Sequence, residues 1–172
     1  MRLRQETAVA FYLFGFSVLF VEVPMRYKTE SEIAEVVRTF EDATISRDAW
    51  KHAEHLTVAL HYLTLHDIEA ATEKMRSGIF KLLRAFEVDL TKEMPYHETM
   101  TVFWMRAVAS YNASKNGVTL LDRANEMVEL LDKEYPLRFY SREVLFSDKA
   151  RAEFVEADVK PLETELSPVS FR

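Results

Sequence analysis

The histidines of this sequence are unevenly placed and are its first candidates for chemistry. Four of the five lie within one fifteen-residue stretch and the fifth lies further along: His52, His55, His61, His66 and His97. His52 and His55 are three residues apart, which places both imidazoles on one face of a helix. A facing helix of a bundle can supply a further ligand. We therefore predict that His52, His55 and His97 bind one metal ion, whereas His61 and His66 are ordinary helix residues.

A carboxylate beside the third histidine completes the candidate site. Glu98 follows His97 in Tyr96-His97-Glu98-Thr99. Two histidines and one carboxylate are typical ligands of non-haem iron and of catalytic zinc. We expect iron or zinc here, with Glu98 as a fourth ligand or general base; iron would support oxidation, and zinc would activate water for hydrolysis. Glu98 also has a simpler interpretation, because a carboxylate in the first turn of a helix stabilises the helix dipole.

Several common site patterns are absent from the sequence. There is no His-Glu-x-x-His, no Glu-x-x-His repeated on two helices and no Gly-x-Ser-x-Gly. A ferritin-like di-iron site is therefore not indicated. The chain has no cysteine, which excludes thiolate ligands and a cysteine nucleophile.

Aromatic and polar residues flank the histidines and are candidates for the wall of a pocket. The set comprises Trp50, Tyr96, Thr101, Trp104, Tyr140 and Arg142. An arginine such as Arg142 can hold a carboxylate or phosphate group of a ligand, or it can pair with an acid of the protein itself. The aromatic residues have a core interpretation as well, because aromatic side chains at helical spacing usually pack inside.

Two function classes fit these residues. The first is an enzyme with a histidine-rich, metal-dependent site that oxidises or hydrolyses a small molecule. The second is a non-catalytic ligand-binding or interaction module that uses the same His/Glu cluster as a polar core. Convergence of the three predicted ligands beside a pocket would favour the first class.

The elements that must position these residues have the sequence signals of helices. Thr29-x-x-Glu32 is typical of a capping box. Six helices are predicted: from Thr29 to about Phe40, near 47–66, from Asp67 to about Phe86, from Pro95 to about Ser114, from Thr119 to Pro136, and near 148–156. A brief strand at 137–140 is left open. The expected fold is an all-α single-domain bundle of five to six helices with short loops, covering residues 25–162.

Composition and charge limit the partners. The 172 residues include three glycines, five prolines and 48% apolar residues, which suits one helical core and excludes a Gly-rich phosphate loop. The net charge is −6, so we expect no nucleic-acid partner. We expect a cytoplasmic protein that binds a small-molecule substrate or ligand. Whether it forms a homo-oligomer is left open.

The first 24 residues differ from the rest. Arg2 and Arg4 precede an apolar run from Ala8 to Val21, which is shorter than the roughly 20 residues of a membrane span. Three interpretations remain: a start assigned upstream of the true start at Met25, an N-terminal anchor or uncleaved signal with membrane association, or a buried helix or strand of the domain. Residues 163–172 are expected to form a loosely ordered tail.

Three blocks of sequence resemble a family of small bacterial helical proteins of unassigned function. They are Trp50-x-His52-x-x-His55-Leu56, Tyr96-His97-Glu98-Thr99-x-Thr101-x-x-Trp104 and Tyr140-Ser141-Arg142-Glu143-x-Leu145-Phe146-Ser147. The resemblance implies no reaction. It implies that the three blocks belong to one helical domain.

Overall fold

The computed structural model describes residues 8–14, 17–23, 25–89 and 95–162, and within them the main domain is helical. The described helices are α1 (Glu30–Glu41), α2 (His52–Leu65), α3 (Ile68–Ala85), α4 (Glu98–Ser114), α5 (Leu120–Leu130), the 3₁₀ helix η1 (Tyr135–Arg138), α6 (Arg142–Leu145) and α7 (Asp148–Ala152). The prediction of an all-α single-domain bundle is confirmed; five of these helices are long, and η1, α6 and α7 are short.

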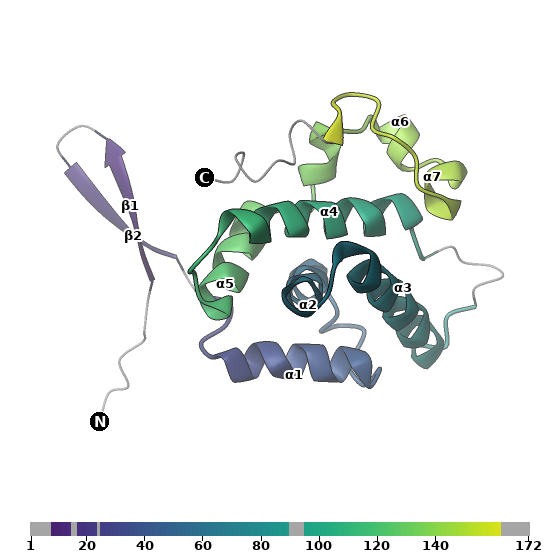
Figure 1. The fold of residues 1–172 in the computed structure, drawn as a ribbon, viewed down its shortest axis with the longest axis horizontal. Helices are drawn as coiled ribbons and strands as arrows, with labels where there is room; N and C mark the ends of the chain where they lie inside the picture. The colour runs from purple at the N-terminus through teal and green to yellow at the C-terminus, as the bar shows by residue number, and fades with distance from the viewer. Residues whose placement is uncertain (1–7, 15–16, 24, 90–94, 163–172) are drawn as a thin grey trace.

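Helix α2 is the centre of the bundle. It packs against α1, α3, α4 and α5, which surround it in Figure 1. Its apolar side chains Leu56, Val58 and Leu60 are completely buried. Truncating one buried leucine of this kind to alanine costs about 2–5 kcal/mol of folding free energy. The two histidines at the start of α2 therefore belong to a helix whose apolar side is buried in the core.

Most helix starts follow the expected caps. The Thr29 hydroxyl accepts the Glu32 amide and the Glu32 carboxylate accepts the Thr29 amide, which is the predicted capping box. Asp67 caps α3 and Thr119 caps α5 in the same way, each accepting the amide three residues ahead. These bonds satisfy amides that have no partner within the helix.

The second helix begins later than predicted. Ser46 caps a turn and not the helix: its carbonyl accepts the amides of Ala49 and Trp50. Helix α2 then starts at His52, with Lys51 as the N-cap. Trp50 therefore lies in a loop, which frees its ring to turn toward the histidines.

The C-terminal third differs most from the predictions. Helix α5 ends at Leu130, and the 3₁₀ helix η1 starts at Tyr135 and contains Pro136, so the segment 137–140 forms no strand. Ser141 caps α6, a helix that was not predicted, and α7 ends at Ala152 where 156 was expected. These elements fold back on α4, as Figure 1 shows for α7.

The N-terminal segment contains two strands. Strands β1 (Ala8–Phe14) and β2 (Ser17–Val23) pair antiparallel, with Ala8 opposite Val23. No helix in the described part of the chain is long and apolar enough to cross a membrane. The expected tail, 163–172, lies outside the described residues.

Candidate functional site

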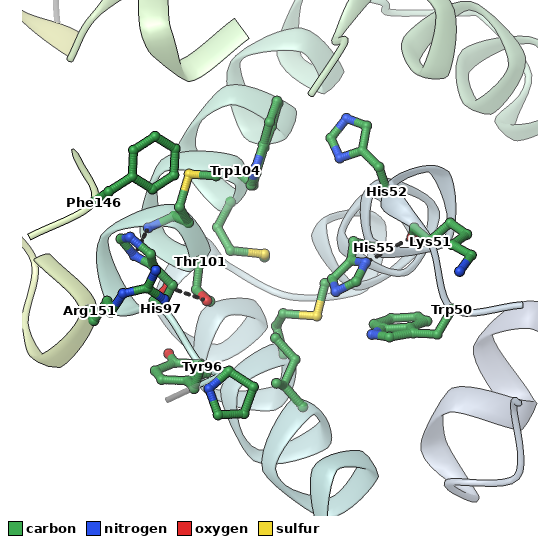
Figure 2. A pocket seen from close by; sticks show the side chains of 15 residues that line it. Trp50, Lys51, His52, His55, Tyr96, His97, Thr101, Trp104, Phe146 and Arg151 are labelled. Atoms are coloured by element: carbon green, nitrogen blue, oxygen red, sulfur yellow. Dashed lines mark hydrogen bonds between the residues drawn. The ribbon is translucent and has the colours of Figure 1, made fainter. Parts of the chain in front are cut away.

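The structure brings seven of the ten predicted site residues to the wall of one pocket. The pocket has a volume of about 440 Å³ and lies between α2, α3, α4 and the segment from Phe146 to Arg151. The seven are Trp50, His52, His55, Tyr96, His97, Thr101 and Trp104 (Figure 2). Since they come from two segments about forty residues apart, the packing of α4 against α2 is what unites them.

Each of the two histidines of α2 donates a hydrogen bond from one ring nitrogen to a backbone carbonyl. His52 Nε2 donates to the Leu131 carbonyl at 2.7 Å, and His55 Nδ1 donates to the Lys51 carbonyl at 2.8 Å. Burial lowers the pKa of His55, and the neighbouring His52 lowers it too, although the Lys51 carbonyl opposes the shift. A neutral His55 therefore carries its lone pair on Nε2, the nitrogen directed to the pocket in Figure 2.

His97 is a structural bridge as well as a wall residue. Its Nδ1 accepts the Met100 amide at 3.2 Å and so caps α4, while its Nε2 donates to the Leu145 carbonyl at 2.7 Å. Both ring nitrogens are thus occupied by the backbone. Burial lowers the pKa of His97, and the positive charge of Arg151 lowers it further, which keeps the ring in the neutral form that can cap.

The three predicted metal ligands are not brought together. In Figure 2, His97 lies across the pocket from His52 and His55. Among the residues that the structure describes, no group of three His, Cys, Asp or Glu side chains is placed to hold a metal ion. The reason is physical: backbone carbonyls and an amide already orient the imidazoles, and they orient them apart. Binding of iron or zinc stays a prediction. The described residues offer no group of three ligands for it.

Glu98 does not line the pocket, contrary to its predicted role there. Its carboxylate accepts two bonds from the Arg76 guanidinium, at 3.1 and 2.5 Å, and one from the Tyr96 hydroxyl. Burial alone would raise the pKa of Glu98, but the bonds from Arg76 and Tyr96 outweigh it and the net pKa is lowered. Burial and the same carboxylate raise the pKa of Tyr96 to about 12. Glu98 is thus an ionised group that fixes the ring of Tyr96.

Two further residues predicted for the pocket wall, Tyr140 and Arg142, do not line this pocket. Tyr140 is 1% exposed; its hydroxyl donates to the Val155 carbonyl, and its ring packs in the core against Phe103. Arg142 is exposed on α6, 3.7 Å from a Glu134 oxygen. The third sequence block therefore supplies a different wall residue, Phe146.

The other residues of the wall were not predicted to line a pocket. The apolar ones are Met75, Ile79, Pro95, Met100, Met105 and Phe146, and the basic ones are Lys51 and Arg151. Arg151 belongs to a charged stretch that reads as solvent-exposed, yet α7 packs against α4 and brings it to the pocket. None of the described lining residues is Asp or Glu.

Rings form two pairs on the wall. The centroids of Trp50 and His55 are 4.0 Å apart, and those of His52 and Trp104 are 4.7 Å apart. A further ring supports each indole from behind: Phe40 stacks on Trp50 at 4.7 Å, and Phe103 meets Trp104 edge to face at 5.2 Å. The pocket wall thus combines packed aromatic rings with the imidazoles of His52 and His55, each of which has one ring nitrogen not bonded to a carbonyl.

Comparison of the chain with models of protein families, with curated proteins and with solved structures gives no match. The resemblance to a family of small bacterial helical proteins therefore stays a prediction, and the function must be argued from the site.

Proposed function

We propose that this protein binds a small organic molecule in the pocket between α2, α3, α4 and α7, and that His55 is its principal hydrogen-bonding group. The observation that carries the proposal is the convergence of both tryptophans and three histidines, from distant segments, on one cavity of about 440 Å³. Ligand sites are typically concave, mostly apolar, and furnished with few polar groups. This cavity has that character.

The hydrogen bonds of the histidine rings favour a non-catalytic binding protein over a metal-dependent enzyme, because backbone groups already occupy ring nitrogens that a metal ion would need. His97 has both nitrogens bonded to backbone groups, and His52 has one. Releasing them to bind an ion would uncap α4 and unpair the Leu145 carbonyl. An uncharged ligand group that donates a hydrogen bond to His55 Nε2 requires no such rearrangement.

Intrinsic fluorescence gives a direct test, because the two tryptophans of the chain, Trp50 and Trp104, both line the pocket. A library of small molecules is titrated against the full chain while tryptophan emission is recorded. We expect hits that change the emission, and weakening of at least tenfold in His55→Gln, since an unpaired polar partner costs about 1–3 kcal/mol. Failure of every compound to bind would contradict the proposal.

A matched control is available on the same helix. His61 lies on α2 beside Tyr62 and does not line the pocket. His61→Gln should leave the affinity of each hit unchanged. Equal weakening in both variants would assign the effect to helix stability and not to the pocket.

General-base chemistry at His55 is a second candidate function. It is favoured by one observation: Nδ1 is anchored on the Lys51 carbonyl, which leaves Nε2 as the basic nitrogen. Hydrolysis of an activated ester such as 4-nitrophenyl acetate tests it. A general base of this kind contributes about 10²–10⁴-fold, so His55→Gln should lose at least that factor. An equal rate in the variant would exclude this role.

A further inference from the structure

We propose that the hairpin of β1 and β2 joins two copies of this chain. Strand β1 pairs antiparallel with β1 of the second copy, and the two hairpins form one four-stranded sheet in the order β2-β1-β1-β2. This inference goes beyond the proposed function and does not depend on the pocket, because none of the described lining residues belongs to the hairpin.

The hairpin is built without support from the helices. Strands β1 and β2, of seven residues each, make their extensive contacts with each other, and Figure 1 shows them projecting away from the helical domain. A two-stranded hairpin by itself is only marginally stable in water; three or more strands, or a packed helix, are needed for independent stability. Addition of further strands supplies what this hairpin lacks.

The hairpin also has open edges. Within the part of the chain that the structure describes, the sheet has two strands, so each strand has one unpaired side. Such an edge exposes backbone N–H and C=O groups and is a template for pairing with another chain. Proteins commonly protect it with a charged residue or a proline. Strand β1, with the sequence Ala-Val-Ala-Phe-Tyr-Leu-Phe, contains neither.

The sequence of β1 is complementary to itself in the antiparallel direction. Pairing of all seven residues about the central Phe11 places this residue opposite its own copy. Each remaining pair then joins a smaller residue to a larger one: Ala8 with Phe14, Val9 with Leu13, and Ala10 with Tyr12. Cross-strand pairs of this kind stabilise a sheet, and like charges are absent from all of them. A second copy of β1 therefore fits β1 in a single full register.

Strand β2 suits the outside of the sheet. It contains Glu22, the one charged residue of the two strands. Pairing of β2 with its own copy about Phe20 would place Glu22 opposite Val18 twice in the middle of the sheet. At an outer edge, the same charge instead opposes the addition of a further strand. Association through β1 thus ends at two copies.

Cysteine crosslinking tests this pairing, because the chain has no cysteine of its own. In Phe11→Cys the two copies of position 11 stand directly opposite, with Cα atoms about 4.5–5.5 Å apart, which is within the range of a disulfide. Mild oxidation of the full-length variant should convert most of it into a covalent dimer. Phe20→Cys is the matched control, because Phe20 is the partner of Phe11 in the hairpin but lies on the outer strand.

The two cysteine variants should differ clearly in rate. We expect Phe20→Cys to crosslink at least tenfold more slowly than Phe11→Cys. Equal rates overturn the proposal, and so does faster crosslinking of Phe20→Cys, which would place β2 at the interface.

A mixture of Ala10→Cys and Tyr12→Cys chains tests the register. Mixed dimers should predominate, because residue 10 lies opposite residue 12 of the second copy. The two copies of either residue are diagonal neighbours about 7–8 Å apart, which is beyond the reach of a disulfide. Dimers of one variant that form as fast as mixed dimers overturn the proposed pairing.

Light scattering after size exclusion measures association without a crosslink. The full chain should have twice the 20.1 kDa mass of one chain. Phe11→Lys should have the mass of a single chain, because two lysines would stand directly opposite, whereas Phe20→Lys should stay a dimer. A single-chain mass for the unaltered chain overturns the proposal. Binding of that monomer to phosphatidylcholine vesicles would assign the hairpin to a lipid surface instead.

Discussion

His97 Nε2 lies 2.7 Å from the carbonyl oxygen of Leu145, and this bond joins the N-cap of α4 to the end of α6. The same ring caps α4 through the Met100 amide. One side chain thus closes a helix start and attaches the C-terminal segment that carries Phe146 and Arg151. The pocket depends on this bond, because both of those residues lie within six positions of Leu145.

Replacing His97 should therefore destabilise the fold. His97→Ala removes a cap and a partly buried hydrogen bond, and we expect a loss of about 2–3 kcal/mol in the free energy of unfolding, measured by urea denaturation. His97→Asn retains a capping side chain and should lose less. Equal losses in the two variants would show that the cap contributes nothing.

Stability should fall as the solution becomes acidic. Burial lowers the pKa of His55, His61 and His97 below the ordinary 6.5. Between each folded-state pKa and 6.5, the unfolded chain binds the proton and the folded chain does not, so the free energy of unfolding decreases as pH falls. The contribution is complete above pH 6.5 and is lost below it. Urea denaturation at a series of pH values from neutral to mildly acidic measures this slope.

The contribution of His97 to the pH dependence of the free energy of unfolding can be measured by itself. His97→Asn should have a shallower slope than the original chain over the same pH range, because one titrating group with a lowered pKa is gone. A slope unchanged by this substitution would contradict the role assigned to His97.

Gly78 should not tolerate a side chain. A Cβ at this position of α3 would overlap the ring of Phe40, which stacks on Trp50. Gly78→Ala should therefore cost about 1–3 kcal/mol through overpacking and should shift the Trp50 emission. The neighbouring exposed residue provides the control: Ser77→Ala is expected to stay within about 0.5 kcal/mol of the original chain. A stabilised Gly78→Ala chain would show that Phe40 moves aside without cost.

Glu98 should act on stability and not on ligand binding. Glu98→Gln breaks the pair with Arg76, and we expect a loss of about 1–3 kcal/mol in thermal or urea denaturation. Glu73→Gln, which removes the more exposed partner of Arg76, should change stability less. The small molecules that change the tryptophan emission should bind Glu98→Gln as tightly as they bind the original chain. Loss of binding with stability intact would place Glu98 in the site after all.

Removal of metal should leave the pocket unchanged. Dialysis of the full chain against a chelator, followed by elemental analysis and the same titration, should alter neither the thermal midpoint nor the affinity, because the imidazoles are oriented by backbone groups. Near-stoichiometric iron or zinc that is lost in His55→Ala would contradict this and would restore the metal-site hypothesis.

The sequence by itself determined the caps of several helices, although it placed the start of α2 too early and did not predict α6. The caps at Thr29, Asp67 and Thr119 are bonds between a side chain and an amide three residues ahead, so their signals are complete within four residues. The histidine and aromatic blocks also identified seven of the fifteen residues that line the pocket, since chemistry-bearing residues were clustered there in an otherwise apolar pattern.

Only the tertiary structure decided what those residues do. The ring nitrogens of His52 and His97 are taken by carbonyls 79 and 48 residues away, and no local pattern encodes such partners. Arg151 reads as a solvent-exposed charge until α7 packs on α4 and turns it to the pocket. The reason is that helix starts depend on neighbours in sequence, whereas the direction of a side chain in a pocket depends on how distant helices pack.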